Sequence, residues 1–520
     1  MPGASVLRVR VFPYAVVFLT AACAMIVELT ASRLVARQHG ATLHTWAALI
    51  AAILAGLSVG SWLGGRLADR AEPARLASRL LLACSVLCLA TLPVMSALQA
   101  ALRPLPYIPR LALLTVGAFL PPALALGAVA PVMARLAVLR AGSGRRGAAL
   151  GAVAAWGSVG SVAGTFLAGF VLVGGLGARA TIVVMSLLLM IPAALLASRR
   201  GRLGHVVWVM VIWMGLFLTR APWPLAQRAA VRIGLLDPGG ILAVDSDYQL
   251  VSVGLHVGGT PPRTLRTLRL DALVHSYFDP RDRFYLHYEY ERVLGEVTLR
   301  VLGGRPSVAA FFLGGGAYSF PRWMQQRWPR ARIEVAEIDP VVVETAHQLF
   351  DLPHDTPIHT HLADGRIALK AMPASAGFDL VFTDVFSDLV VPWHLTTLEF
   401  ARLVASRLSP GGYYALNVID DPAHGRFLGS ILVTLERVFS HVRVFSMGPA
   451  RRGHGMTFML IASKVALPLP AWRVGHSTRF DGVSLPDAEL ARLRQRGRVL
   501  TDDNAPVDLL LEPVTRRRRR

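Results

Sequence analysis

The chain of 520 residues is 53% hydrophobic and has a mean hydropathy of +0.48, which excludes an ordinary soluble enzyme. Its net charge of +21 is unevenly distributed, because residues 1–240 carry 21 Arg and only four acidic residues. Most of the excess therefore lies between hydrophobic segments, as the positive-inside rule expects, and this argues against a nucleic-acid partner.

Seven hydrophobic segments without acidic or basic side chains occupy the first 220 residues, at 11–27, 38–65, 80–102, 111–134, 147–178, 180–198 and the shorter 203–219. Most of them reach the roughly 20 residues that a helix needs to cross a bilayer. No small-residue cleavage site stands out after the first segment, so a retained helix is favoured over a signal peptide. We therefore predict a polytopic α-helical membrane domain of six or seven helices over residues 1–220, with membrane lipid as its partner.

Arg-rich loops follow the second, fourth and sixth segments, near residues 66–79, 135–146 and 199–202. The N-terminus and these loops should therefore face the cytoplasm. A seventh crossing at 203–219 would place the C-terminal part outside, in conflict with a cytosolic nucleoside substrate. An interfacial 203–219, or an earlier segment that does not span, would remove the conflict, and the sequence leaves this choice open. We expect a multi-pass protein of the cell membrane with a cytoplasmic catalytic domain.

Small residues recur at helical spacing in two of these segments, Gly56, Gly60 and Gly64 in one and Gly160 and Gly164 in the other. Such stripes let membrane helices approach closely, so a packing role is expected. Glu28 is the one acidic residue well inside the predicted bilayer zone; a functional role and a pairing with Arg33 both explain it. All three cysteines lie in the hydrophobic segments, which excludes disulfides and cysteine metal sites from the C-terminal part.

The hydrophobic pattern of the sequence changes near residue 240, after a Pro- and Gly-containing linker at 221–240. Strands are predicted at Tyr248–Val257 and Thr267–Asp271, in a small β-rich part over 241–305. Strand–helix alternation from Val308 to Asn417 predicts a parallel sheet with helices on both faces, in a doubly wound α/β domain over 306–515. The basic tail 516–520 is expected to be a solvated end.

The strongest functional pattern is a β-rich run, Val308–Leu313, that ends in Gly314, Gly315 and Gly316. About twenty residues later a second run, Ile333–Ile338, carries Glu337 and is followed by Asp339. Glycines let the backbone turn tightly beside a ligand, and an acid at the tip of the next strand accepts hydrogen bonds from ribose hydroxyls. This spacing predicts a nucleoside-binding βαβ unit.

Two more acids fall at predicted strand ends, Asp364 after the third strand and Asp384 after the fourth, with Asp388 four residues further on. Ligands of a doubly wound sheet lie at the carboxyl ends of its strands. Any one of these acids is equally well explained as a helix N-cap, but three successive strands ending in an acid favour a ligand site.

The run GGG…AEID…ADG…FTD, with Tyr248, Gln249, an LRLD segment and a Tyr-Glu pair before it, resembles the polyamine aminopropyltransferases, the spermidine synthases. The resemblance covers roughly residues 240–465, and ELTASRL, LGGRLADR and the closing TDDNAPVDLL are similar to the membrane-embedded branch of that superfamily. It implies a methyltransferase-type Rossmann-like fold behind a small β-domain. It also implies decarboxylated S-adenosylmethionine, or S-adenosylmethionine, as a co-substrate with no permanently bound cofactor.

The resemblance also implies roles for single residues. Gln249 would contact the nucleoside, Gly314–Gly316 would shape its pocket, and Glu337 would hold the ribose. Asp364 and Gly365 would reach the base, and Asp384 would accept the proton of the attacking amine. Three residues would lie on the amine side of the site: Tyr288, Glu289 and Asp388.

Two departures from the family pattern bear on the donor and the acceptor. Ala317 stands where soluble members have an acid that binds the aminopropyl end, and the 384–388 loop is one residue longer than in the family. Three nearby histidines, His354, His359 and His361, are expected to be surface residues rather than metal ligands, since no acid accompanies them at helical spacing. No metal site is therefore predicted.

Three hypotheses follow for this chain. The first is a membrane-anchored aminopropyltransferase acting on a small-molecule amine and a nucleoside, which the Gln249 and Asp384 matches favour. The second is an S-adenosylmethionine-dependent methyltransferase of the same fold. The third, which Ala317 favours, is a non-catalytic transporter or sensor with a polyamine- or nucleoside-binding domain. Homo-oligomerisation is left open.

Overall fold

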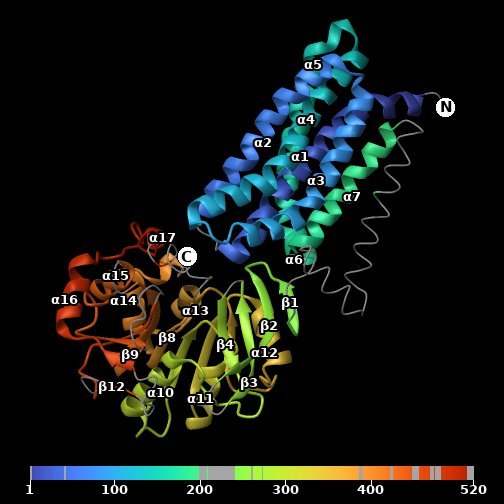
Figure 1. Ribbon diagram of the computed structural model, residues 1–520. Helices are drawn as coiled ribbons and strands as arrows, with labels where there is room; N and C mark the ends of the chain where they lie inside the picture. Colours follow the sequence, from blue (N-terminus) through green and yellow to red (C-terminus); the bar gives the residue numbers. More distant parts are fainter. Residues whose placement is uncertain are drawn as a thin grey trace. The chain divides into compact units, whose positions relative to one another are not determined.

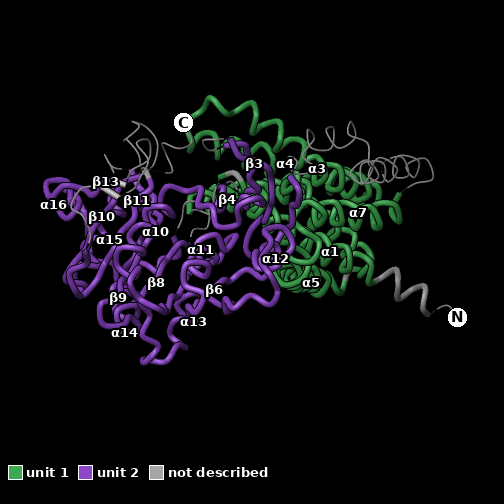
Figure 2. The backbone as a smooth tube through the Cα atoms, turned by 90° about the horizontal axis from the view of Figure 1, so that it is seen from below, with its two compact units in different colours: residues 1–239 green, residues 240–520 purple. Residues whose placement is uncertain are grey.

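The computed structural model describes residues 3–39, 43–197, 208, 240–258, 262–271, 273–385, 391–421, 425–447, 456–468, 473–474, 482–511 and 514. The chain divides into two compact units, Met1–Gly239 and Gly240–Arg520 (Figure 2). The predicted seventh hydrophobic segment, 203–219, lies outside the described residues apart from Trp208, as does the predicted amine-side residue Asp388.

The first unit is a bundle of long helices that run side by side (Figure 1). Six spans of its described residues are long and apolar enough to cross a membrane, judged by length and composition. They correspond to the first six predicted segments. The helical elements are α1 (Gly3–His39), α2 (Leu43–Arg70), α3 (Pro73–Ala101), α4 (Tyr107–Ala141), η1 (Ser143–Arg145), α5 (Arg146–Leu167), η2 (Ala168–Leu172), α6 (Val173–Leu176) and α7 (Ala178–Leu196).

The glycine stripes lie where helix backbones meet. A Cβ atom on Gly60 of α2 would lie 2.1 Å from the carbonyl oxygen of Leu124 in α4, and one on Gly160 of α5 would lie 2.3 Å from that of Phe18 in α1. No side chain fits at such distances, so the stripes serve helix packing, as their spacing predicts. Glu28 is half-buried in α1.

The second unit begins with a four-stranded antiparallel sheet in the order β1-β2-β3-β4. Its strands are β1 (Leu242–Asp245), β2 (Leu250–Gly258), β3 (Arg263–Leu270) and β4 (Leu273–Phe278). The sequence predicted β2 and β3, whereas β1 and β4 are short and carry no strict alternation of their own. Helix α10 (Glu289–Leu302) follows the sheet.

A nine-stranded sheet forms the centre of this unit, in the order β12-β13-β10-β11-β9-β8-β5-β6-β7. The five strands from β9 to β7 are parallel, as predicted, and the four beyond β9 are antiparallel, which the alternation pattern did not reveal. The strands are β5 (Ala309–Leu313), β6 (Arg332–Glu337), β7 (His359–Leu362), β8 (Phe378–Thr383), β9 (Leu408–Asp420), β10 (His441–Met447), β11 (Met456–Ser463), β12 (Arg473–Val474) and β13 (Gly482–Ser484).

Helices cover both faces of the parallel part because successive residues of each strand point to opposite sides. On β5, Phe311 packs with α13, α14 and α15, whereas Phe312 packs with α10 and α11. The helices are α11 (Ser319–Arg327), α12 (Pro340–Leu349), α13 (Gly365–Ala371), η3 (Ala374–Ala376), η4 (Trp393–Leu395), α14 (Leu398–Arg407), α15 (Phe427–Leu435), α16 (Asp487–Arg496) and α17 (Val507–Leu510).

The strand order reverses at β5, which pairs with β6 on one side and β8 on the other. Open α/β sheets bind ligands in the crevice beyond the carboxyl ends of the strands at this switch point. The residues that follow β5 and β8 are Gly314 and Asp384, so the fold brings together the two segments that the sequence singled out.

Candidate functional site

The glycine turn after β5 requires glycine at two of its three positions. Gly314 has φ +91°, and a Cβ atom there would lie 2.5 Å from the backbone oxygen of Asp384. Gly316 has φ +52°, and its Cβ would lie 2.7 Å from Ser276 Oγ on β4. A side chain would therefore be strained and would also collide with its neighbours. The turn draws together the ends of β5, β8 and the small sheet.

Glu337, the last residue of β6, lies beneath this turn and is only 8% exposed. Its carboxylate accepts hydrogen bonds from the backbone N–H of Gly315 (2.9 Å) and of Asp339 (3.1 Å). Burial raises the pKa of Glu337, and these two donors oppose that rise. An ionised carboxylate has about four acceptor positions, so Glu337 has room for a further donor.

Asp339 and Ser246 connect the two sheets of the unit. Asp339 caps α12 by accepting the N–H of Val341 (3.0 Å), and it also accepts the hydroxyl of Ser246 (2.6 Å). Burial raises the pKa of Asp339, and the Ser246 hydroxyl and the nearby Gln249 side chain are among the groups that oppose that rise. Asp339 therefore acts as an N-cap that also joins α12 to the small sheet through Ser246.

Asp384 follows β8 and is held by two side chains from other elements. Tyr290 of α10 donates its hydroxyl to one carboxylate oxygen (2.7 Å), and the Asn417 amide of β9 donates to the other (2.9 Å). Burial raises the pKa of Asp384, and these two hydrogen bonds oppose that rise. The neighbouring Glu291 is buried. Burial, together with the smaller effect of the Asp384 charge, raises the pKa of Glu291 to about 8. The two carboxyl groups therefore interact in one acidic patch.

The predicted amine-side residues Tyr288 and Glu289 are followed on α10 by a second Tyr-Glu pair, Tyr290 and Glu291. Tyr288 donates its hydroxyl to the backbone oxygen of Val274 (2.5 Å), and neither Tyr288 nor Glu289 lines the crevice. Tyr290 and Glu291, the next two residues, do line it. The signal was available, because Tyr290 continues the helical spacing of the buried positions 293, 294 and 297.

Asp364 caps α13 and contacts a histidine that the sequence analysis missed. One of its oxygens accepts the N–H groups of Arg366 (3.0 Å) and Ile367 (3.1 Å). Its other oxygen lies 2.8 Å from His394 Nε2. Asp364 is therefore both an N-cap and a cavity residue, because it also lines the crevice with Gly365.

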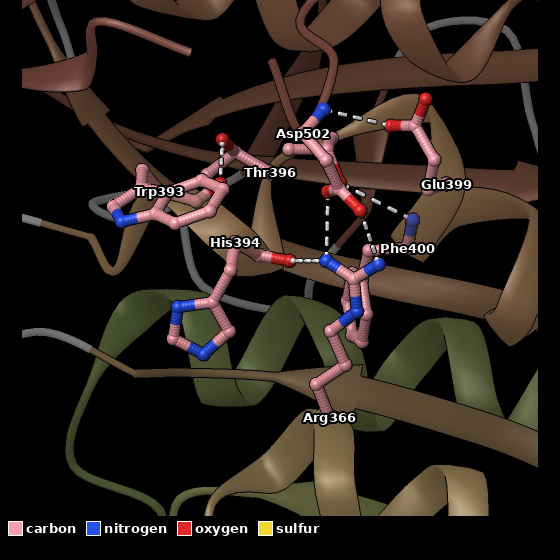
Figure 3. Close-up of polar contacts among 8 residues, drawn as sticks. Arg366, Trp393, His394, Thr396, Glu399, Phe400 and Asp502 are labelled. Atoms are coloured by element: carbon pink, nitrogen blue, oxygen red, sulfur yellow. Dashed lines mark hydrogen bonds and ion pairs between the residues drawn. The ribbon is translucent and has the colours of Figure 1, made fainter. Parts of the chain in front are cut away.

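The closing TDDN segment anchors this corner through Asp502 (Figure 3). The Arg366 guanidinium forms two hydrogen bonds with the Asp502 carboxylate (2.8 and 2.7 Å) and one with the His394 carbonyl (3.0 Å). Thr397 donates its hydroxyl to Asp502 (2.7 Å), whose backbone N–H donates to Glu399 (3.0 Å). The hydrogen-bonded Arg366 guanidinium lowers the pKa of Asp502. The network ties α13, and with it Asp364, to α14.

These elements enclose a cavity of about 270 Å³. It is lined by every predicted nucleoside-side residue and by the predicted proton acceptor, namely Gln249, Gly314, Gly315, Gly316, Glu337, Asp364, Gly365 and Asp384. Four carboxyl groups face it, those of Glu291, Glu337, Asp364 and Asp384. None of the described lining residues is Lys or Arg, and His275 is the one basic side chain among them. The cavity therefore suits a cationic ligand.

Comparison with known proteins gives two polyamine aminopropyltransferases among the relatives. The probable enzyme of Bifidobacterium longum is 28% identical over 230 residues, which cover 39% of this chain and 48% of that protein. The enzyme of Vibrio vulnificus is 26% identical over 249 residues, covering 45% of this chain and 79% of that protein. This protein is spermidine synthase-like. The chain spans about half the length of the first of these relatives.

A second group of relatives consists of methyltransferases. The eEF1A lysine and N-terminal methyltransferase of Xenopus laevis is 27% identical over 192 residues, covering 34% of this spermidine synthase-like chain and 27% of that protein.

A solved probable spermidine synthase from Corynebacterium glutamicum has 21% sequence identity and a TM-score of 0.41, over 51% of this chain and 89% of that one. No protein-family model matches the chain. The fold assignment rests on the strand order described above.

Proposed function

We propose that this protein transfers an aminopropyl group from decarboxylated S-adenosylmethionine to a small-molecule amine. The observation that carries the proposal is the charge of the cavity, in which four carboxyl groups meet no Lys or Arg among the described lining residues. Decarboxylated S-adenosylmethionine has a sulfonium and an ammonium group and no carboxylate. Its charge is therefore complementary to the cavity throughout its length.

The same charge disfavours S-adenosylmethionine itself, whose carboxylate would lie among carboxylates. Two unit charges about 5 Å apart interact by roughly 3 kcal/mol at an effective dielectric constant near 20. Part of this energy is lost to water and to the proton that Glu291 retains near neutral pH. A preference of about tenfold or more for the decarboxylated donor is the conservative expectation.

In the proposed reaction, the nitrogen lone pair of the amine attacks the donor carbon next to sulfur. A carbon–nitrogen bond forms as the carbon–sulfur bond breaks, and sulfur leaves as the neutral thioether of methylthioadenosine. The proton of the attacking amine passes to Asp384, whose orientation is held by Tyr290 and Asn417. Glu337 holds the ribose and Asp364 lies near the base, so that the donor carbon points toward Asp384.

The test uses detergent-solubilised full-length protein and compares three ligands by calorimetry: S-adenosylmethionine, its decarboxylated form and methylthioadenosine. The expected result is preferential binding of the decarboxylated donor, with release of methylthioadenosine when putrescine or spermidine is added. Tighter binding of S-adenosylmethionine, with methyl transfer to an acceptor, would replace the proposal by the methyltransferase hypothesis. Binding of the decarboxylated donor without any transfer would favour the non-catalytic sensor.

One observation keeps the methyltransferase hypothesis as the second candidate. Ala317 replaces the family acid, is fully buried and does not line the cavity. A methyl donor needs the ribose carboxylate Glu337 but no acid at the aminopropyl end. The methyltransferase relatives are compatible with this alternative.

We also propose that the helical unit anchors the enzyme in the cell membrane with its catalytic unit in the cytoplasm, where nucleoside and amine are available. The support is the set of six spans of suitable length and composition, together with the Arg-rich loops. Contact with lipid and a homo-oligomeric state stay predictions. Fractionation of cells that express the protein, followed by extraction with carbonate and with detergent, tests the anchoring; release by carbonate alone contradicts it.

A further inference from the structure

A second cluster of side chains lies at the β6–β7 edge of the nine-stranded sheet, away from the cavity. Glu334 of β6 pairs in register with His359 of β7, and His361 follows two residues later on the same side of the strand. Glu334 Oε2 lies 3.0 Å from His359 Nδ1 and 2.8 Å from His361 Nε2. The two ring nitrogens are 3.1 Å apart. None of the three residues lines the cavity.

Glu334 Oε2 has two lone pairs and can accept an N–H from each ring, which brings the two hydrogen atoms close together. If either ring nitrogen lacks a proton, its lone pair faces the negatively charged oxygen at about hydrogen-bond distance. A cation placed between the three atoms would meet a lone pair from each.

We propose that Glu334, His359 and His361 bind a divalent transition metal ion of the zinc class. Imidazole nitrogen and carboxylate oxygen are ligands that zinc accepts at about 2.0–2.2 Å, which sets tetrahedral ligand atoms about 3.3 Å apart. The three atoms here lie within a few tenths of an ångström of that separation. The His359 side chain is 68% exposed, so a water molecule can complete the coordination from the solvent side.

Surface histidines were expected here because no acid lies at helical spacing from them in the sequence. Both histidines belong to a strand, and the acid comes from the neighbouring strand 25 residues before His359. His354 differs from the other two, because its ring stacks on His347 at 4.3 Å between centroids. It therefore serves as a matched control for a histidine in the same region.

The position of the cluster gives the metal a structural role. Glu334 lies three residues before Glu337 on β6, and His361 lies three residues before Asp364 after β7. A bound ion would cross-link the two strands that carry these cavity carboxylates. Metal binding is therefore expected to stabilise the folded unit, since any ligand that binds only the native state does so.

The test is a titration of tag-free, detergent-solubilised full-length protein with Co²⁺, whose visible absorption reports tetrahedral coordination, followed by displacement with Zn²⁺. One ion per chain is expected. Glu334→Gln and His359→Ala should each weaken binding by at least about tenfold, whereas His354→Ala should match the wild type. Zn²⁺ should raise the melting temperature of the wild type and of His354→Ala and leave that of the two ligand variants unchanged.

His359→Ala changes an exposed side chain and Glu334→Gln keeps the shape of its side chain, so at least one variant should fold. Circular dichroism and gel filtration check this. Absence of Co²⁺ binding, or weak binding that both folded variants retain, overturns the proposal. Neither result depends on aminopropyl transfer, so the metal site and the proposed function fail separately.

Discussion

Replacing Asp384 by Asn separates an enzyme from a binding protein. The substitution keeps the size of the side chain and removes its ability to accept a proton. Tyr290 can still donate its hydroxyl to the new amide oxygen. The Asn417 Oδ1 atom has no hydrogen-bond partner among the described residues, so a flip of the Asn417 amide would let it accept from the new NH₂ group. The structure therefore accommodates the variant.

The expected effect falls on turnover rather than on binding. Loss of a general base reduces the rate by roughly 10²–10⁴, which corresponds to about 3–5 kcal/mol of transition-state stabilisation. In the proposed complex Glu337 and Asp364 hold the nucleoside, so its dissociation constant should change by no more than about threefold. Removal of the Asp384 charge also removes one cause of the raised pKa of Glu291, which should fall.

The assay measures methylthioadenosine released from decarboxylated S-adenosylmethionine with a saturating amine, and calorimetry measures nucleoside affinity. Asp420→Asn is the matched control, because Asp420 is a buried acid at the end of the neighbouring strand β9 and does not line the cavity. It should retain wild-type turnover. Turnover above about a tenth of the wild-type rate in Asp384→Asn, or a folded variant that no longer binds nucleoside, refutes the assignment of Asp384 as proton acceptor.

Two further predictions follow from the same site, and a third concerns the helical unit. Glu291 has a pKa near 8, and a bound cation favours its charged form, so affinity for the decarboxylated donor should rise as pH increases toward 8. Binding at pH 7.5 should therefore release protons, which calorimetry in buffers of different ionisation enthalpy measures. Glu291→Gln should abolish this release. Glu337→Ala should weaken nucleoside binding by tenfold to more than a hundredfold, since each charge-assisted bond is worth about 1.5–3 kcal/mol, and unchanged calorimetric affinity in a folded variant removes the ribose role. Cysteines introduced at 66–79 should react only with membrane-permeant reagents in intact cells. Reaction with an impermeant reagent would place this loop outside the cell and contradict the predicted topology.

The residues predicted for a nucleoside site line one cavity because short-range constraints determine their positions. The turn after β5 needs left-handed backbone at Gly314 and Gly316, and the positions of Glu337 and Asp384 follow from the ends of predicted strands. The carboxyl ends of parallel strands meet at one edge of a sheet, so these residues come together once the alternation of strands and helices is recognised.

The sequence did not predict contacts between elements that are distant along the chain. Asp502 contacts Arg366, which is 136 residues away in the sequence. The antiparallel strands beyond β9 pair with segments distant along the chain, and no local sequence pattern marks these pairings. On α10, the resemblance selects Tyr288 by residue type, whereas the residues that line the cavity there are Tyr290 and Glu291. The β6–β7 cluster was missed for a related reason, since cross-strand neighbours have no fixed separation in sequence.

Ala317 stands where soluble family members have an acid, but its side chain is buried and does not face the cavity. This side chain packs in an apolar cluster with residues of the small sheet and of α12, and its backbone N–H donates to Ser276 Oγ (3.1 Å). A carboxylate at this position would lose its hydration, at a cost of several kcal/mol, without facing the cavity. The negative charge at the reacting end comes instead from Glu291 on α10 and from Asp384 after β8. In the proposed reaction these two groups would meet the ammonium group of the donor, so the absence of an acid at position 317 does not by itself exclude the decarboxylated donor.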